Sequence, residues 1–346
     1  FPGSSLPNAM VQVSPVTKFH SGAGYQYEDS VIYGFTHTNK GHWNLCHIPL
    51  LPVTGTPTPG DYCSPFSHER ESAAPGYYQV FLDRYGVDAQ LSSTLRCAFH
   101  KYTYPAGAAA SLLADLQRSN EHVRAWDIRK EGDNVFAGWQ QTGEKMYFYA
   151  VANRPVTGIE PVVEGDREVR IVRFGEGDGA LELRIGFSFV SEKNARENLE
   201  AEMLGKSFAE VRSEATATWN DLLGRIRVEG GTEREKGLFY SSLYRSFLWP
   251  ALRSDVNGEF TDVDGKVINP GFRYYTGPSY WDDYRNKLIL LGMLAPDVAA
   301  DVISSDTDKG EKRGGFMPTF FHGDHASAFV AGTYLRGNRG FDVNRA

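Results

Sequence analysis

The sequence lacks several features that assign a protein to a common functional class. It has three cysteines in 346 residues, with no CxxC pair and no Cys/His spacing typical of a zinc site. It has no basic run, and its formal net charge of -7 disfavours a general nucleic-acid binder, because phosphate binding needs concentrated positive charge. No apolar stretch is long enough to span a bilayer as a helix. A GxSxG elbow, a phosphate-binding loop and a dinucleotide fingerprint are also missing, so serine-hydrolase chemistry and nucleotide use have no support.

The cysteines and the first residue bear on the compartment. Cys97 falls on the apolar face of an expected strand and is predicted to pack there. A bridge between Cys46 and Cys63 could form in an oxidising compartment, but the sequence does not require it. The first residue is Phe and no signal peptide is visible, so we expect a mature, trimmed or partial product.

Aromatic residues are abundant. They make up 13% of the chain, with 18 Tyr and 6 Trp. This composition suits a protein that stacks rings against sugars, and it equally suits a large β-rich core. The length of 346 residues favours two domains.

The first 200 or so residues show the period-2 alternation of strands. VDAQLSSTLRCAFHK, residues 87–101, is predicted to form one long half-buried strand, because Val87, Leu91, Cys97 and Phe99 share one parity. GYYQVFLDRYG is its expected hairpin partner, and ALELRIGFSFV repeats the pattern. Long strands with Gly-rich connections indicate a large antiparallel β-sandwich.

The pattern changes near Ser191, and helical spacing appears in SFAEVRSEATATWNDLLGRI, residues 207–226. Two capping boxes mark helix starts, Ser207 with Glu210 and Thr232 with Glu235. The second helix is expected to bury a stripe made of Leu238, Phe239, Leu243 and Phe247. Further helices are predicted to start near Ser279, Pro296 and Gly323. We therefore expect a β-sandwich domain over residues 1–204, a helical linker over 205–230, and a helical toroid or bundle over 231–346.

The stretch SYWDDYRNK, residues 279–287, has two interpretations. Ser279 could cap a helix whose first turn holds acids, with Asp282 paired to Arg285 three residues on. Alternatively, Trp281 and Arg285 share a helical face, and an indole beside a carboxylate and a guanidinium can bind the vicinal hydroxyls of a hexose. Because adjacent residues on a helix point in different directions, only one of the two acids, Asp282 or Asp283, is expected to enter a pocket.

A second candidate region is GFTHTNKGHWNLCHIPLLP, residues 34–52. His37 and His42 are expected in a Gly-containing loop rather than on one helix face, so the sequence does not favour a metal site. The loop is predicted to present Trp43 and His42 to a ligand, or else simply to connect two strands.

Two further stretches contain acids. Asp324 and His325 stand at an expected helix start, where Asp324 caps the helix or the pair reaches a cavity. DVNGEFTDVDGK, residues 255–266, does not meet EF-hand spacing, and its Asn-Gly and Asp-Gly dipeptides predict two tight turns.

Several long stretches together resemble glycoside hydrolase family 92, the calcium-dependent exo-acting α-mannosidases. They are YQYEDSVIYGFTHT, SHERESAAPGYYQVFLDRYGVDAQLSSTLRCAFHKYTYP, YRSFLWPALRSDVNGEFTDVDGK, FRYYTGPSYWDDYR and GDHASAFVAGTYLRGNRGFD. The resemblance covers nearly the whole chain, in order. It implies an N-terminal antiparallel β-sandwich followed by the opening helices of an (α/α)6 toroid, with the active site in the cleft between them.

The resemblance also implies a chemistry. A carboxylic acid protonates the leaving oxygen while a carboxylate activates water, and the two carboxyls of such inverting enzymes stand about 6.5–9.5 Å apart. Calcium is the implied cofactor, mannose-containing glycans are the implied substrates, and such enzymes are usually exported. The match of WDDYR to the family's motif implies that Asp282 binds sugar hydroxyls in the −1 subsite, supported by Trp281 and Arg285.

The chain departs from the family's pattern in two places. The His-Glu-Pro motif of the general acid and the Gly-Asp-rich motif of the base are not recognisable before Ala346, so the chain resembles an N-terminal half. The acid, the base and the calcium ligands are expected beyond Ala346. TNKGHWNLCH stands where many members have a Ser-Gly-Thr-Gly-rich segment, which puts the linkage preference in doubt. Two alternatives stay open: an inverting glycoside phosphorylase and a non-catalytic carbohydrate-binding protein.

Overall fold

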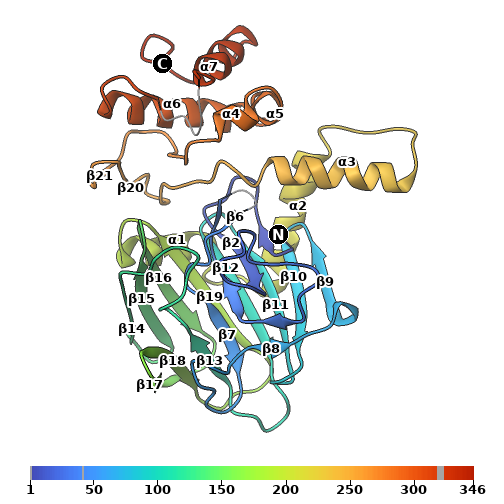
Figure 1. Ribbon diagram of the computed structural model, residues 1–346, viewed down its shortest axis with the longest axis vertical. Helices are drawn as coiled ribbons and strands as arrows, with labels where there is room; N and C mark the ends of the chain where they lie inside the picture. The colour runs from blue at the N-terminus through green and yellow to red at the C-terminus, as the bar shows by residue number, and fades with distance from the viewer. Residues whose placement is uncertain (1, 41–42, 318–322) are drawn as a thin grey trace. The chain divides into compact units, whose positions relative to one another are not determined.

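The computed structural model describes residues 2–40, 43–317 and 323–346. The chain forms two compact units, Phe1–Trp219 and Asn220–Ala346 (Figure 1). No helix within the described ranges is both long and apolar enough to cross a membrane.

The first unit contains two large antiparallel sheets. The seven-stranded sheet has the order β1 (Ser4–Ser5), β2 (Gln12–Val16), β4 (Gly34–Thr36), β7 (Leu50–Val53), β13 (Ser111–Ala114), β18 (Arg167–Phe174) and β17 (Val156–Glu164). The eight-stranded sheet has the order β14 (Ala125–Lys130), β15 (Val135–Gln141), β16 (Lys145–Ala152), β19 (Leu181–Ser188), β12 (Cys97–Thr103), β11 (Val87–Ser93), β10 (Tyr77–Leu82) and β9 (Glu71–Ala74). Short pairs add β3 (Val31–Ile32) with β8 (Ser64–Pro65), and β5 (Asn39–Lys40) with β6 (Trp43–Asn44), while η1 (His68–Arg70) precedes β9.

Aromatic side chains hold the two sheets together. The Phe35 ring on β4 lies 6.3 Å from that of Tyr102 on β12, and the Phe136 ring on β15 lies 6.3 Å from that of Phe174 on β18. Alternate residues of β16 are buried, as expected for a strand with one face on a core. The predicted β-sandwich is confirmed.

The single long strand predicted over residues 87–101 is wrong. The chain turns at Thr94, whose N–H donates to Cys97 O at 2.9 Å, so β11 and β12 form an antiparallel hairpin. Leu91 is paired with His100, so these two side chains share a face. The parity of the buried face therefore switches across the turn, and Cys97 and Phe99 lie on the opposite face from Leu91.

The face that carries Cys97 is covered by helices. The residues packed together there are Tyr77, Cys97, Phe99, Leu199, Met203, Phe208 and Val211. They come from the sheet, from α1 (Glu192–Glu202), which the sequence analysis did not predict, and from α2 (Phe208–Leu223). The predicted packing of Cys97 is confirmed, and all three cysteines are free thiols, so Cys46 and Cys63 are not bridged.

The second unit is mainly helical. It contains α3 (Glu233–Ser246), the hairpin β20 (Phe260–Thr261) and β21 (Val267–Ile268), α4 (Tyr280–Asp283), α5 (Lys287–Leu294), α6 (Pro296–Lys312) and α7 (Ala326–Leu335). Both predicted capping boxes are present, because each Glu carboxylate accepts from the cap residue's N–H and each cap hydroxyl accepts from the Glu N–H. The two predicted turns are confirmed by the bonds Gly258 N–H to Asp255 O and Gly265 N–H to Asp262 O, each 3.0 Å.

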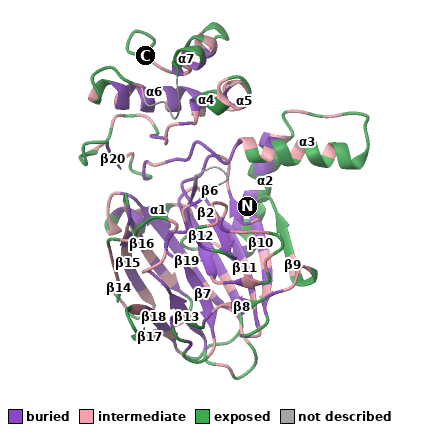
Figure 2. Ribbon diagram, in the orientation of Figure 1, coloured by how far each residue is buried: buried purple, intermediate pink, exposed green. Residues whose placement is uncertain are grey.

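The predicted buried stripe of α3 is half wrong. Leu243 and Phe247 are buried, whereas Leu238 is 58% exposed and Phe239 is 37% exposed. Figure 2 shows that most of α3 is exposed. Helical spacing places side chains on one face, but only packing against another element buries them. Here that packing is confined to the C-terminal end of the helix.

Candidate functional site

The described candidate residues are divided between the two units. Trp43 belongs to the first unit. The second unit contains Trp281, Asp282, Arg285, Asp324 and His325. His42 lies outside the described residues.

The short helix α4 presents the acid and indole predicted to contact a sugar. Tyr280 is buried, Trp281 is 46% exposed, and Asp282 is exposed. The predicted capping by the Ser279 side chain is wrong, because its hydroxyl donates to the Asp282 carboxylate at 2.5 Å and makes no cap bond to the backbone. The Ser279 carbonyl accepts the N–H groups of Asp282 and Asp283 instead. The α4 tip, defined as residues 279–282, thus holds Asp282 by a local hydrogen bond.

The predicted pairing of Asp282 with Arg285 is also wrong within the described structure. The neighbouring acid, Asp283, is paired with Lys287 at 2.7 Å, and the Arg285 guanidinium lies 5.0 Å from the centre of the Tyr284 ring. The helix that would place Arg285 in register with Asp282 and Trp281 ends at Asp283, and a turn separates it from α5. Arg285 therefore does not share a helical face with Asp282, three residues earlier, or with Trp281, four residues earlier.

The start of α7 lies beside this turn. The His325 ring stacks on that of Tyr284, with centroids 4.4 Å apart and planes 8° apart. Asp324 caps the helix, because its carboxylate accepts the N–H of Ser327 at 3.1 Å and also its hydroxyl. These hydrogen bonds favour the charged form and lower the pKa of Asp324. The structure therefore brings His325 and the Tyr284–Arg285 turn together and gives Asp324 a structural role.

Asp324 also borders a pocket of the second unit, about 670 Å³ in volume. The described residues that line it are Thr307, Gly310, Glu311, Gly315, Phe316, Met317, Gly323, Asp324, Ser327, Arg345 and Ala346. The Arg345 guanidinium is paired with Glu311 at 2.7 Å. The residues of the α4 tip do not appear in this lining, so the pocket and the tip are separate features of the described structure.

In the first unit, His37 lies in the segment between β4 and β5, but its side chain is not open to a ligand. It follows β4 directly, is fully buried, and its Nε2 lies 3.1 Å from Nε2 of His100. Burial disfavours the charged ring and lowers the pKa of His37 to about 3. The His100 Nδ1 in turn lies 2.6 Å from the Tyr102 hydroxyl. His37 therefore lies in a connecting segment, as predicted, but its side chain is part of the sandwich core.

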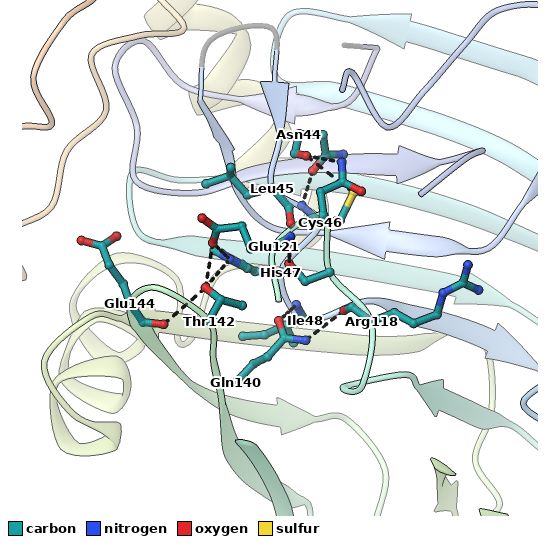
Figure 3. Close-up of polar contacts among 12 residues, drawn as sticks. Asn44, Leu45, Cys46, His47, Ile48, Arg118, Glu121, Gln140, Thr142 and Glu144 are labelled. Atoms are coloured by element: carbon teal, nitrogen blue, oxygen red, sulfur yellow. Dashed lines mark hydrogen bonds and ion pairs between the residues drawn. The ribbon is translucent and has the colours of Figure 1, made fainter. Parts of the chain in front are cut away.

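The segment after β6 is fixed by contacts that local sequence reasoning missed (Figure 3). His47 Nε2 lies 2.8 Å from the Glu121 carboxylate and 3.1 Å from the Thr142 hydroxyl. The Gln140 side chain accepts the Ile48 N–H at 2.8 Å. Cys46 and Ile48 have φ values of 56° and 51°, in the left-handed region. This region costs conformational energy, especially for the β-branched Ile48. Those partners come from residues more than 70 positions away, so local patterns could not reveal them.

Trp43 is presented from this anchored region. It belongs to the β5–β6 pair and is 53% exposed. Part of its ring lies against Gly22, where an added Cβ would stand 2.9 Å from the indole. A glycine at φ 74° therefore lets the indole approach the backbone closely while much of the ring stays open to solvent.

No group of three or more His, Cys, Asp or Glu side chains that could hold a metal ion occurs in residues 2–40, 43–317 and 323–346. Calcium prefers six to eight oxygen ligands. The described part of the chain therefore supplies no identified set of calcium ligands.

Comparisons with known proteins agree with this architecture. A solved α-mannosidase of family GH92, BT3965 from Bacteroides thetaiotaomicron, is 26% identical with a TM-score of 0.93, over 100% of this chain and 53% of that chain. The same protein has been solved in complex with mannoimidazole. The solved GH92 glycosyl hydrolase ccman5 is 28% identical with a TM-score of 0.85, over 99% of this chain and 52% of that chain.

A curated relative is an uncharacterized secreted glycosidase of Arthroderma benhamiae. It is 25% identical over 314 residues, which are 75% of this chain and 40% of the relative. The chain thus spans about half the length of the solved relatives and less of the curated one. Residues 1–198 match the glycosyl hydrolase family 92 N-terminal domain, and residues 194–346 match the family 92 catalytic domain. The chain belongs to glycoside hydrolase family 92.

Proposed function

We propose that the protein encoded by the complete gene is an exo-acting α-mannosidase that hydrolyses terminal α-mannosides of glycans with inversion. The observation that carries this proposal is the α4 tip, where Trp281 and Asp282 are exposed in a chain of family 92. An exposed indole beside an exposed carboxylate offers both a stacking surface and a strong hydrogen-bond acceptor for a hexose.

Asp282 has the central binding role. One of its oxygens, Oδ2, accepts the Ser279 hydroxyl, and within the described structure the other remains able to accept sugar hydroxyls. Trp281 stacks against the apolar face of the ring, and Arg285 binds a hydroxyl directly, since it is not paired with Asp282. Trp43 and His42 are also proposed to contact the glycan, and Asp324 and His325 to support the sugar-binding residues from the start of α7.

The proposal separates binding from bond cleavage. Inversion needs one carboxylic acid that protonates the leaving oxygen and one carboxylate that activates water. Asp282 is proposed to bind sugar hydroxyls and to take neither of these two catalytic roles. Calcium assistance is part of the proposal through the family, and no residue of this chain is assigned to the ion. Export of the protein is also proposed, and it is supported by the curated relative being named a secreted glycosidase.

The test is hydrolysis of an aryl α-mannoside by the protein from the complete gene, with the released anomer followed by NMR. The proposal predicts β-mannose as the first product, at a rate that does not depend on phosphate. Cleavage that requires phosphate would identify a phosphorylase. Binding of mannosides without cleavage would identify a carbohydrate-binding protein.

A further inference from the structure

A buried ion pair lies in α6, outside the residues proposed to contact sugar. The Lys309 Nζ lies 2.8 Å from Asp306 Oδ1, and the two side chains are 10% and 0% exposed. Lys309 also donates to the Tyr275 carbonyl at 2.9 Å. Removing two charges from water is costly and demands further hydrogen bonds. The other groups that hydrogen-bond to Asp306 and Lys309 therefore indicate which segment the ion pair holds in place.

The second oxygen of Asp306 holds Tyr280. The Tyr280 hydroxyl donates to Asp306 Oδ2 at 2.6 Å, and the side chain is fully buried. Burial, with the Asp306 carboxylate beside it, raises the pKa of Tyr280 well above its ordinary value, so the phenol remains a donor. Its ring also lies 6.1 Å from that of Phe329 on α7. Tyr280 therefore ties α4 to both α6 and α7.

The backbone leading into α4 runs close to the same pair. A Cβ added to Gly277 would stand 3.4 Å from Asp306 Oδ1 and 3.8 Å from Lys309 Nζ. The Gly277 carbonyl accepts the indole N–H of Trp249 at 3.1 Å. Contacts at Tyr275, Gly277 and Tyr280 thus fix the segment immediately before Trp281 and Asp282.

We propose that Asp306 is a positioning residue, which sets the place of Asp282 by holding Tyr280, two residues earlier in the chain. Asp306 itself does not touch the sugar. The inference rests on the proposed function, because Asp282 has to bind substrate for its place to matter. Displacing a binding group by about 1 Å can lower the rate about 100-fold, so a single buried phenol can affect catalysis.

The competing explanation is that the network only stabilises the second unit. A double-mutant cycle separates the two explanations, because residues that act through one another give non-additive effects. The variants are Tyr280→Phe, Asp282→Ala and the double variant, made in the protein from the complete gene. The matched control is Tyr240→Phe, which removes a phenol that donates to the Ile226 carbonyl at 3.0 Å in the same unit.

The measurement is kcat/KM for an aryl α-mannoside, together with the Kd of mannoimidazole. Tyr280→Phe is expected to lower kcat/KM about tenfold or more, to weaken mannoimidazole binding in parallel, and to add nothing in the Asp282→Ala background. Tyr240→Phe is expected to stay within about twofold of the wild type. Additive losses, or equal effects of the two Tyr variants, would overturn the positioning role.

Two replacements at Asp306 distinguish loss of the Tyr280 hydrogen bond from a general folding defect. Asp306→Asn keeps an acceptor for Tyr280, whereas Asp306→Ala removes it, and both remove the charge that faces Lys309. We expect Asp306→Asn to keep kcat/KM within about threefold and Asp306→Ala to lose about tenfold or more, per folded molecule. Equal activities of the two variants would contradict the inference. A wild-type protein that neither hydrolyses nor binds mannosides would remove the proposed function, and this role with it.

Discussion

The contact between α1 and the β11–β12 turn offers a sharp test of the sandwich. The Glu202 carboxylate, on the last residue of α1, accepts three hydrogen bonds from this turn. They come from the Thr94 hydroxyl at 2.6 Å, the Arg96 N–H at 2.9 Å and the Arg96 guanidinium at 2.6 Å. The Arg96 side chain is 8% exposed and that of Glu202 is 14% exposed. One side chain thus fastens a helix to a hairpin.

Replacing Glu202 with Ala removes all three bonds and leaves the Arg96 guanidinium without this carboxylate. Breaking a fully buried pair costs about 3–5 kcal/mol. The partial exposure of Glu202 reduces the expected loss to about 2–3 kcal/mol. For a unit of this size, 1 kcal/mol lowers Tm by about 2–4 °C. The expected decrease in Tm is therefore about 4–12 °C.

The matched control is Glu200→Ala on the same helix. Glu200 is paired with Arg196 at 2.7 Å, but both side chains are exposed, so we expect Tm to change by about 2 °C or less. The assay is thermal unfolding of each variant, followed by circular dichroism at the β-sheet band. Equal Tm values for the two variants would refute the reasoning that Glu202 anchors α1 to the hairpin.

The remaining predictions concern pH and metal. The pKa of His37 is about 3 in the fold, whereas that of an unfolded His is about 6.5. Between these pH values only the unfolded chain binds the proton. The sandwich is therefore expected to lose stability as pH falls, by about 2 kcal/mol from pH 6.5 to 5. Thermal unfolding at pH 7 and pH 5 checks this, and His37→Gln should show a smaller acid-induced decrease in Tm; an unchanged decrease would contradict it. Exhaustive chelation of the protein from the complete gene should abolish mannoside hydrolysis, and added Ca²⁺ should restore it, whereas full activity after chelation would exclude the calcium requirement.

Local sequence signals predicted the elements that depend on local physics. The alternation in ALELRIGFSFV predicted β19, and the Ser and Thr spaced three residues before Glu predicted the starts of α2 and α3. The Asn-Gly and Asp-Gly dipeptides predicted both turns before α4. In each case the residues that decide the structure lie within a few positions of one another.

The failures involve partners distant in sequence. The alternation along residues 87–101 could not reveal the turn at Thr94, because both faces of the sheet are buried there. One face is covered by the opposite sheet and the other by helices. The spacing in α3 could not say which of its apolar residues would find a neighbour. The burial of His37 within its predicted loop could not be foreseen, because its partner, His100, lies 63 residues away. Ser279 is a local exception, because it was expected to cap the backbone but its hydroxyl donates to Asp282, three residues on.

The candidate site was predictable mainly as a motif. The stretch SYWDDYRNK identified Trp281 and Asp282, which the structure places at an exposed helix tip. The network that fixes this tip could not be predicted, because Asp306 and Lys309 join Tyr280 from another helix. The expected partnership of Asp282 with Arg285 depended on a helix that continues past Asp283, and it ends there.

The most direct test of the account compares two adjacent acids. Asp282→Ala and Asp283→Ala are made in the protein from the complete gene, and kcat/KM is measured for an aryl α-mannoside. A hydrogen bond to a charged group contributes about 1.5–3 kcal/mol, so loss of Asp282 should lower kcat/KM roughly 10- to 100-fold. Asp283, paired with Lys287, should have little effect beyond stability. Unchanged kcat/KM for Asp282→Ala would contradict the account.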